Sequence, residues 1–98
     1  MLTSVANVAT DTPARYAKQL ASHLGRRVEV ENLPGDGYRL VFDAAEGVLT
    51  PEPDRLVMRA SAPDAETLAR IQDVLGRHLE RFGQRKELTV TWEAATEQ

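Results

Sequence analysis

The sequence predicts an α+β fold: an antiparallel sheet covered on one face by two helices. Two segments carry apolar residues at helical spacing, and the other apolar residues alternate with polar ones, as they do in half-buried strands. The predicted order is β-α-β-β-β-β-α-β. Four consecutive short strands joined by tight turns favour antiparallel pairing, so both helices are expected to lay their apolar stripes on the same side of the sheet.

The first helix is expected to start after Thr10, because Asp11 or Thr12 can cap its free amides and Pro13 suits a first turn. Gly25 is expected to end it in the left-handed cap conformation. The residues that share its apolar stripe are Tyr16, Ala17, Leu20 and Leu24.

The second helix is expected to open at residues 61–64, which offer a cap candidate and an early proline, and to stop at Gly83. Its exposed face pairs each acid with a base four residues later, as in Asp73 and Arg77. Its apolar stripe consists of Leu68, Ile71, Leu75, Leu79 and Phe82.

Strands are predicted at 3–9, 27–31, 38–43, 48–50, 55–60 and 87–93, with turns at 34–37, 44–47 and 51–54. The sheet face away from the helices is expected to meet water, with Val41 and Val57 leaving a shallow surface for a ligand or a dimer partner. The residues assigned to that face are Arg27, Glu29, Arg39, Val41, Asp43, Arg55, Val57 and Arg59.

Composition limits the class of protein. The length of 98 residues predicts one domain over 1–98, with 94–98 expected to fray, and 42% apolar residues are ordinary for a globular chain. The absence of cysteine excludes disulfides and suits the reducing cytoplasm. The first residues lack a signal-peptide pattern, and no apolar run approaches the ~20 residues that cross a membrane. A net charge of −3 argues against nucleic-acid binding.

The candidate site residues are polar groups at the edges of the helix stripes. His23 and His78 each lie three residues after a stripe leucine, so their rings meet if the helices are neighbours. A catalytic zinc needs a third protein ligand, and neither histidine has one a turn away, so no metal or cofactor is predicted. The favoured interpretation is that both are boundary residues of the core. Lys18 and Arg81 complete the candidate ligand-binding set.

Basic residues gather where each helix ends. Functionally they could form an anion patch; structurally, cations near helix C-termini oppose the helix dipole, and the acids nearby favour a neutralised surface network. These basic residues are Arg26, Arg27, Arg77, Arg81, Arg85 and Lys86.

Two stretches, YAKQLASHLGRR at 16–27 and RHLERFGQRKELTVTWE at 77–93, resemble the bacterial domain-of-unknown-function family numbered 2218. The resemblance implies a TATA-binding-protein-like fold and no assigned activity, and it associates some members with siderophore-utilisation genes and with siderophore-interacting flavin reductases. The family often carries a further histidine near the position of Arg26 and an aromatic residue near Gln84. Arg26 stands in place of this possible third imidazole, which weakens the hypothesis that a metal site of the family is present in this chain.

These observations favour a non-catalytic binding or interaction module for a small molecule or a protein, with a role near siderophore or iron metabolism. The alternative is a small enzyme or metal-dependent catalyst that uses His23 and His78 as acid and base. A third reading is a homodimer formed through the polar sheet face or an edge strand.

Overall fold

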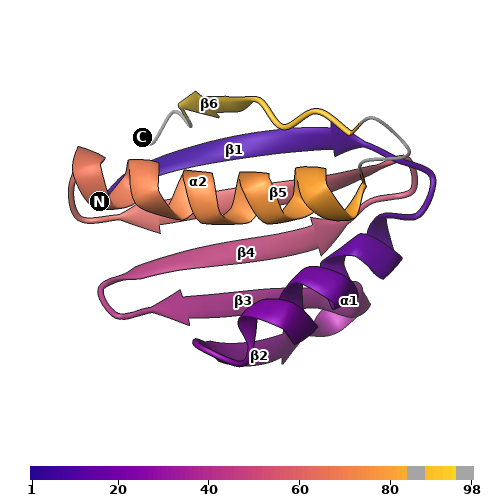
Figure 1. The fold of residues 1–98 in the computed structure, drawn as a ribbon, viewed down its shortest axis with the longest axis horizontal. Coiled ribbons are helices and arrows are strands. Elements are labelled where there is room, and N and C mark those ends of the chain that lie inside the picture. The colour runs from indigo at the N-terminus through magenta and orange to yellow at the C-terminus, as the bar shows by residue number, and fades with distance from the viewer. Residues whose placement is uncertain (84–87, 95–98) are drawn as a thin grey trace.

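The computed structural model describes residues 1–83 and 88–94. Its element order confirms the predicted α+β fold (Figure 1). The strands are β1 (Leu2–Ala9), β2 (Glu29–Leu33), β3 (Gly37–Phe42), β4 (Ala45–Pro51), β5 (Arg55–Ala62) and β6 (Trp92–Ala94). The helices are α1 (Pro13–Leu24) and α2 (Ala65–Phe82), and a short 3-10 turn at Pro34–Asp36 joins β2 to β3.

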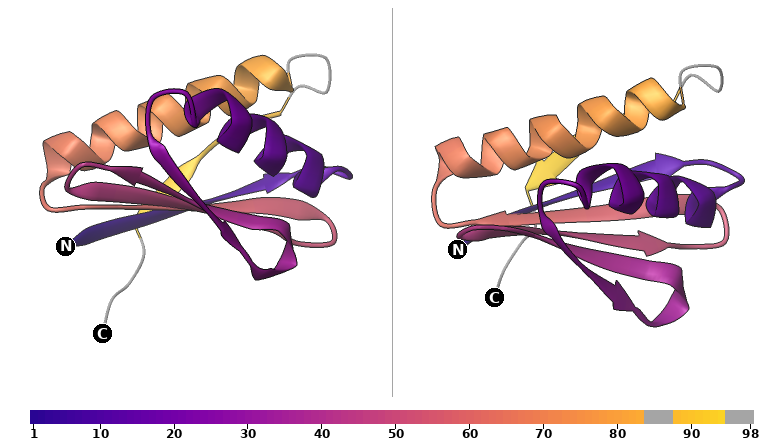
Figure 2. Two further views of the ribbon diagram at one scale, coloured as in Figure 1. Left: turned by 90° about the horizontal axis from the view of Figure 1, so that it is seen from below. Right: turned by 60° about the horizontal axis from the view of Figure 1, so that its bottom comes forward.

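The described strands form one antiparallel sheet in the order β2-β3-β4-β5-β1-β6. Both helices lie on the same face of this sheet (Figure 2). Helix α2 packs across β5, β4 and β1, and α1 packs across β3, β4 and β5. The two helices also contact each other, and this contact brings their polar edges together.

The core lies between the helices and the sheet. The α1 residues predicted to face the core are all buried; in the α2 stripe Ile71, Leu75 and Leu79 are buried while Leu68 and Phe82 are half-buried. From the sheet, Leu40 and Met58 are fully buried, and Val90 packs against the same cluster. Because Leu20 and Leu75 point into this cluster, the hydrophobic periodicity identified the buried faces correctly.

The helix ends differ in part from the expectation. Asp64 caps α2 by accepting a hydrogen bond from the Thr67 amide at 2.7 Å, so the cap lies within the expected residues 61–64. Thr12 caps α1 without a side-chain hydrogen bond, and Gly25 is right-handed (φ −61°) rather than left-handed. The need for glycine there is steric, because a Cβ would lie 2.8 Å from the carbonyl oxygen of Ala21.

Strand β4 is longer than predicted, because the turn before it is confined to Asp43 and Ala44. Asp43 takes a positive φ of 47° at that turn, so its assignment to the outer sheet face was wrong. Gly47 was predicted to be in the turn but lies within β4 beneath Leu75, where an added Cβ would come within 2.9 Å of a leucine methyl.

The last strand is shorter than predicted. Only Trp92–Ala94 pairs with β1, one residue into the segment expected to fray, and residues 95–98 lie outside the described part. Before β6, the Val90 amide donates to a carboxylate oxygen of Glu80 on α2 at 3.1 Å. This hydrogen bond ties the segment before Trp92 to the helix.

The sheet face away from the helices carries a network of ion pairs around Arg39. Arg39 bridges Glu31 at 3.1 Å and Glu46 at 2.7 Å across three neighbouring strands, which raises the pKa of its guanidinium. This network neutralises the polar face, as expected for a solvated sheet surface. Arg27 was also assigned to this face, but it lies in the turn after α1 and lines a pocket on the helix side.

Candidate functional site

The two histidines meet where α1 and α2 touch. Their ring centroids are 5.0 Å apart, with an angle of 47° between the ring planes. The ring of Phe82 lies edge-on to His23 at 5.6 Å and is 6.3 Å from the ring of His78, so the three rings form one cluster. The predicted approach of the two imidazoles is therefore present. It arises because each histidine lies at the edge of its helix's apolar stripe and the two helices contact each other.

The tautomer of His78 is set by a hydrogen bond within its own helix. Its Nδ1 lies 2.6 Å from the backbone carbonyl oxygen of Val74, one turn earlier. A carbonyl only accepts hydrogen bonds, so Nδ1 carries the proton and donates it. In the neutral ring the lone pair is then on Nε2, which is free to accept a proton, a hydrogen bond or a metal ion.

His23 is surrounded by positive charge. Partial loss of hydration lowers its pKa below the ordinary value of 6.5, and the charges of His78, Arg26, Arg81 and Arg27 lower it further. Among the residues that the structure describes, no acid contributes to this shift. An anion placed beside His23 would oppose each of these charges and favour the imidazolium form.

Two adjoining pockets share His23 and Arg26 as a common wall. The first, of about 450 Å³, is the cationic pocket, and its lining residues are Arg15, Lys18, Gln19, Ser22, His23, Arg26 and Phe82. The second, of about 360 Å³, is the apolar pocket, and its lining residues are His23, Leu24, Arg26, Arg27, Val28, Phe42, Val74 and His78. Volumes of this size are typical of small-molecule sites.

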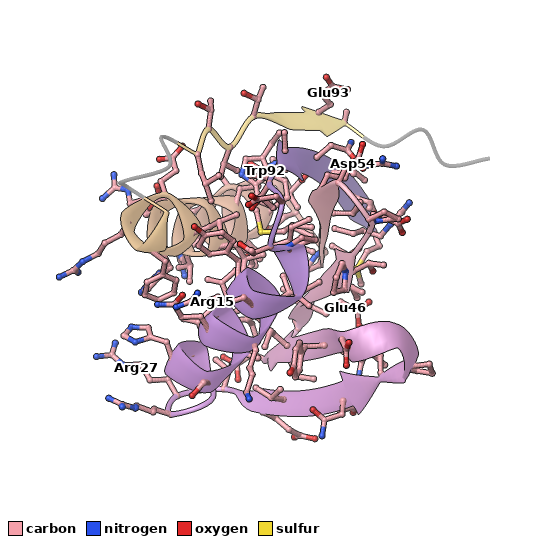
Figure 3. The ribbon with its side chains drawn as sticks, turned by 90° about the vertical axis from the view of Figure 1, so that its right-hand side faces the viewer. Arg15, Arg27, Glu46, Asp54, Trp92 and Glu93 are labelled. Atoms are coloured by element: carbon pink, nitrogen blue, oxygen red, sulfur yellow. The ribbon has the colours of Figure 1, made fainter. Side chains whose placement is uncertain are left out.

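The cations around these pockets, here called the cationic cluster, are Arg15, Lys18, Arg26, Arg27 and Arg81. None of them forms an ion pair with another residue in the described ranges 1–83 and 88–94. Figure 3 shows Arg15 on α1 and Arg27 near its end, whereas the labelled acids Glu46, Asp54 and Glu93 lie over the strands. In this view the two labelled arginines therefore lie apart from the labelled acids.

The basic residues near the helix ends divide into two groups. Arg77 pairs with Asp73 at 2.8 Å, as the neutralised-network interpretation predicted. Arg26, Arg27 and Arg81 have no acid partner in the part of the chain that the structure describes, so for them the interpretation stays a prediction. Arg85 and Lys86 lie outside the described residues.

Of the predicted site residues, Lys18 and His23 share the cationic pocket, and His78 joins His23 in the apolar pocket. Arg81 lines neither pocket, but its charge reaches His23. Sequence reasoning missed Arg15. Its signal was a polar stripe along α1, the residues Arg15, Lys18, Ser22 and Arg26 at spacings of three and four.

A metal ion would find two protein ligands at this place, the imidazoles of His23 and His78. No group of three or more His, Cys, Asp or Glu side chains suited to a metal occurs among the described residues. A metal held here would therefore need its other ligands from a bound molecule or from water.

Comparison with known proteins assigns the chain to a family. Residues 5–93 match the model of the family described as an uncharacterised protein conserved in bacteria, DUF2218. The chain belongs to this family. No curated protein matches the chain. The NMR structure of PA4090 from Pseudomonas aeruginosa is similar, with a TM-score of 0.82 and 32% identity over 99% of this chain and 100% of that one.

Family membership confirms the resemblance found in the sequence, and the match to the solved structure supports the described fold. Neither comparison names an activity or a ligand for the family. None of the helices in the described ranges is long and apolar enough to cross a membrane.

Proposed function

We propose that this member of DUF2218 is a non-catalytic binding module that holds a small anionic ligand at His23 and His78. The observation that carries the proposal is the pair of adjacent imidazoles within a cationic cluster that lacks acid partners among the described residues. Like charges held close together repel one another, and a bound anion relieves that repulsion.

The geometry favours binding over phosphate-loop chemistry or nucleophilic catalysis. The Gly35 to Gly37 turn joins two strands, so it does not present a helix N-terminus to a phosphate. The ligand contacts come instead from long side chains on two helices, which supply charge and several hydrogen-bond donors.

The wider role we propose is accessory to siderophore or iron metabolism in the cytoplasm. Its support is the association with siderophore genes that the sequence resemblance implies, together with the charge of the site, since a cationic pocket suits a negatively charged ferric chelate. The imidazole nitrogens near the pocket are also ligands that suit iron.

The test is a titration of the ¹⁵N-labelled chain with inorganic phosphate and, separately, with ferric siderophores, followed by amide shifts. We expect phosphate to shift the amides of Lys18, His23 and Arg81. Arg81→Gln should weaken binding several-fold, because it removes a positive charge that acts on the site although Arg81 lines neither pocket.

The matched control is Arg77→Gln, an arginine one turn away on α2 that is already paired with Asp73. It should bind phosphate as the unmodified chain does. Equal weakening by both variants, or no shift with any anion, would overturn the proposal. Shifts with phosphate but none with ferric siderophores would remove only the iron-related role.

The alternative function is proton transfer or metal-dependent catalysis by the same histidines. One observation favours it: the hydrogen bond to Val74 leaves Nε2 of His78 as a free base next to a second imidazole. A zinc titration followed by the imidazole resonances tests it. If zinc shifts the resonances of both rings, and no longer shifts those of His23 in His78→Gln, the result supports this function. If neither ring shifts, the metal-dependent form of this function is wrong.

A further inference from the structure

The two pockets beside His23 differ in chemistry, and this difference indicates what kind of anion fits. The cationic pocket is lined almost wholly by polar side chains of α1. The apolar pocket lies between the end of α1, β3 and α2, and Leu24, Val28, Phe42 and Val74 form its floor and sides.

The apolar pocket leaves hydrophobic surface in contact with solvent. Val28, Phe42 and Val74 are each half-buried, although all three pack against the core. A simple anion such as phosphate would leave this apolar surface exposed to water. An apolar group that covers it would gain free energy in proportion to the area removed from water.

We infer that the preferred ligand is an amphipathic monoanion, a carboxylate carried on one aromatic ring. The carboxylate lies against Arg26 and His23, the wall common to both pockets, and the ring enters the apolar pocket between Phe42 and Val74. This inference rests on the proposed anion-binding function and specifies its ligand class.

The dimensions of the apolar pocket agree with this occupant. A dry cavity of about 150 Å³ binds benzene in another protein. The apolar pocket, at about 360 Å³, holds one ring with room to spare. The hydrogen bond from Nδ1 of His78 to the Val74 carbonyl oxygen fixes the orientation of that imidazole. The edge of the ligand's ring can therefore pack against it.

The test compares benzoate with acetate, which lacks the ring, and with benzyl alcohol, which lacks the charge, by amide shifts of the ¹⁵N-labelled chain at one pH and ionic strength. We expect benzoate to bind at least tenfold more tightly than acetate. Benzoate should shift the amides of Val28, Phe42 and Val74 as well as those of His23 and Arg26.

Val74→Ala is the variant that separates the two pockets. It should weaken benzoate several-fold and leave phosphate unchanged, because it shortens the apolar wall and touches no charge. Val57→Ala is the matched control, since Val57 is an equally half-buried valine on the far face of the sheet. It should leave both ligands unchanged.

The outcomes separate this inference from the function on which it rests. If phosphate binds and benzoate binds no more tightly than acetate, the ligand class is wrong while the anion site remains. If benzyl alcohol binds as tightly as benzoate, the carboxylate has no role and the inference is overturned. If none of the anions shifts His23 or Arg26, both the inference and the proposed function are overturned.

Discussion

At the scale of single residues, His23 makes the stability of the fold depend on pH. Its folded pKa lies below 6.5, the value expected in the unfolded chain, so the folded protein binds fewer protons than the unfolded one in the window below 6.5. Stability from this group is fully present above pH 6.5 and is lost as the pH falls through the lower folded pKa.

We therefore expect His23→Gln to flatten the acid loss of stability between about pH 7 and 5. Urea denaturation across that range measures it, with Ser22→Ala, an exposed neighbour that does not titrate, as the control. A steeper loss in His23→Gln than in the unmodified chain would contradict the account, because it would mean that folding raises this pKa.

At the scale of secondary-structure elements, α2 lies close to β4 because Gly47 has no side chain. A Cβ at this position would meet a methyl of Leu75 at 2.9 Å. We expect Gly47→Val to destabilise the fold by roughly 1–3 kcal/mol, the usual cost of overpacking a core. The free energy of unfolding in urea measures it.

Thr50→Val is the control for this prediction, because it adds an apolar residue to an exposed position of the same strand. It should change stability by less than about 0.5 kcal/mol. Equal stability of Gly47→Val and the unmodified chain would show that the helix does not sit against β4 as described.

Elements with strong periodicity could be predicted from the sequence, and elements held by tertiary contacts could not. The apolar stripe of α2 identified the buried positions around Leu75, because that face of the helix packs only against the core. Gly47 was misread as a turn residue, since glycine signals a turn locally, whereas the helix above the strand requires it here. The end of the last strand depends on pairing with β1, which no local pattern reports.

The same distinction applies to the candidate site. The meeting of His23 and His78 followed from their stripe positions, so the sequence predicted it. The pairing of Arg77 with Asp73 was predicted from their spacing of four residues, but the gathering of Arg15 with Lys18 and Arg26 at one pocket was not. The turn that carries Arg27 to the helix side was also unpredictable, since alternation with Val28 suggested a strand.

At the scale of the whole molecule, we propose that the chain unfolds as one domain. Circular dichroism reports the helices, and the single tryptophan, Trp92, reports the edge of the sheet at β6. The two probes should give coincident denaturation curves. Separate midpoints would show that the C-terminal strand is not part of the same cooperative unit.

Leu75 lies at the centre of that unit and is fully buried. Leu75→Ala should lower the free energy of unfolding by about 2–5 kcal/mol and move both probes together. Leu2→Ala, at an exposed leucine of β1, is the control and should have a small effect. A small effect at Leu75 would contradict the described core.

The central claim is that His23 and its neighbouring cations form an anion site. An NMR pH titration of the His23 imidazole in sulfate and in chloride, at equal ionic strength, tests it most directly, because sulfate keeps its charge across this range. The account predicts that sulfate raises the pKa of His23 by relieving the repulsion from Arg26, Arg27 and Arg81. Coincident titration curves in the two salts would contradict it.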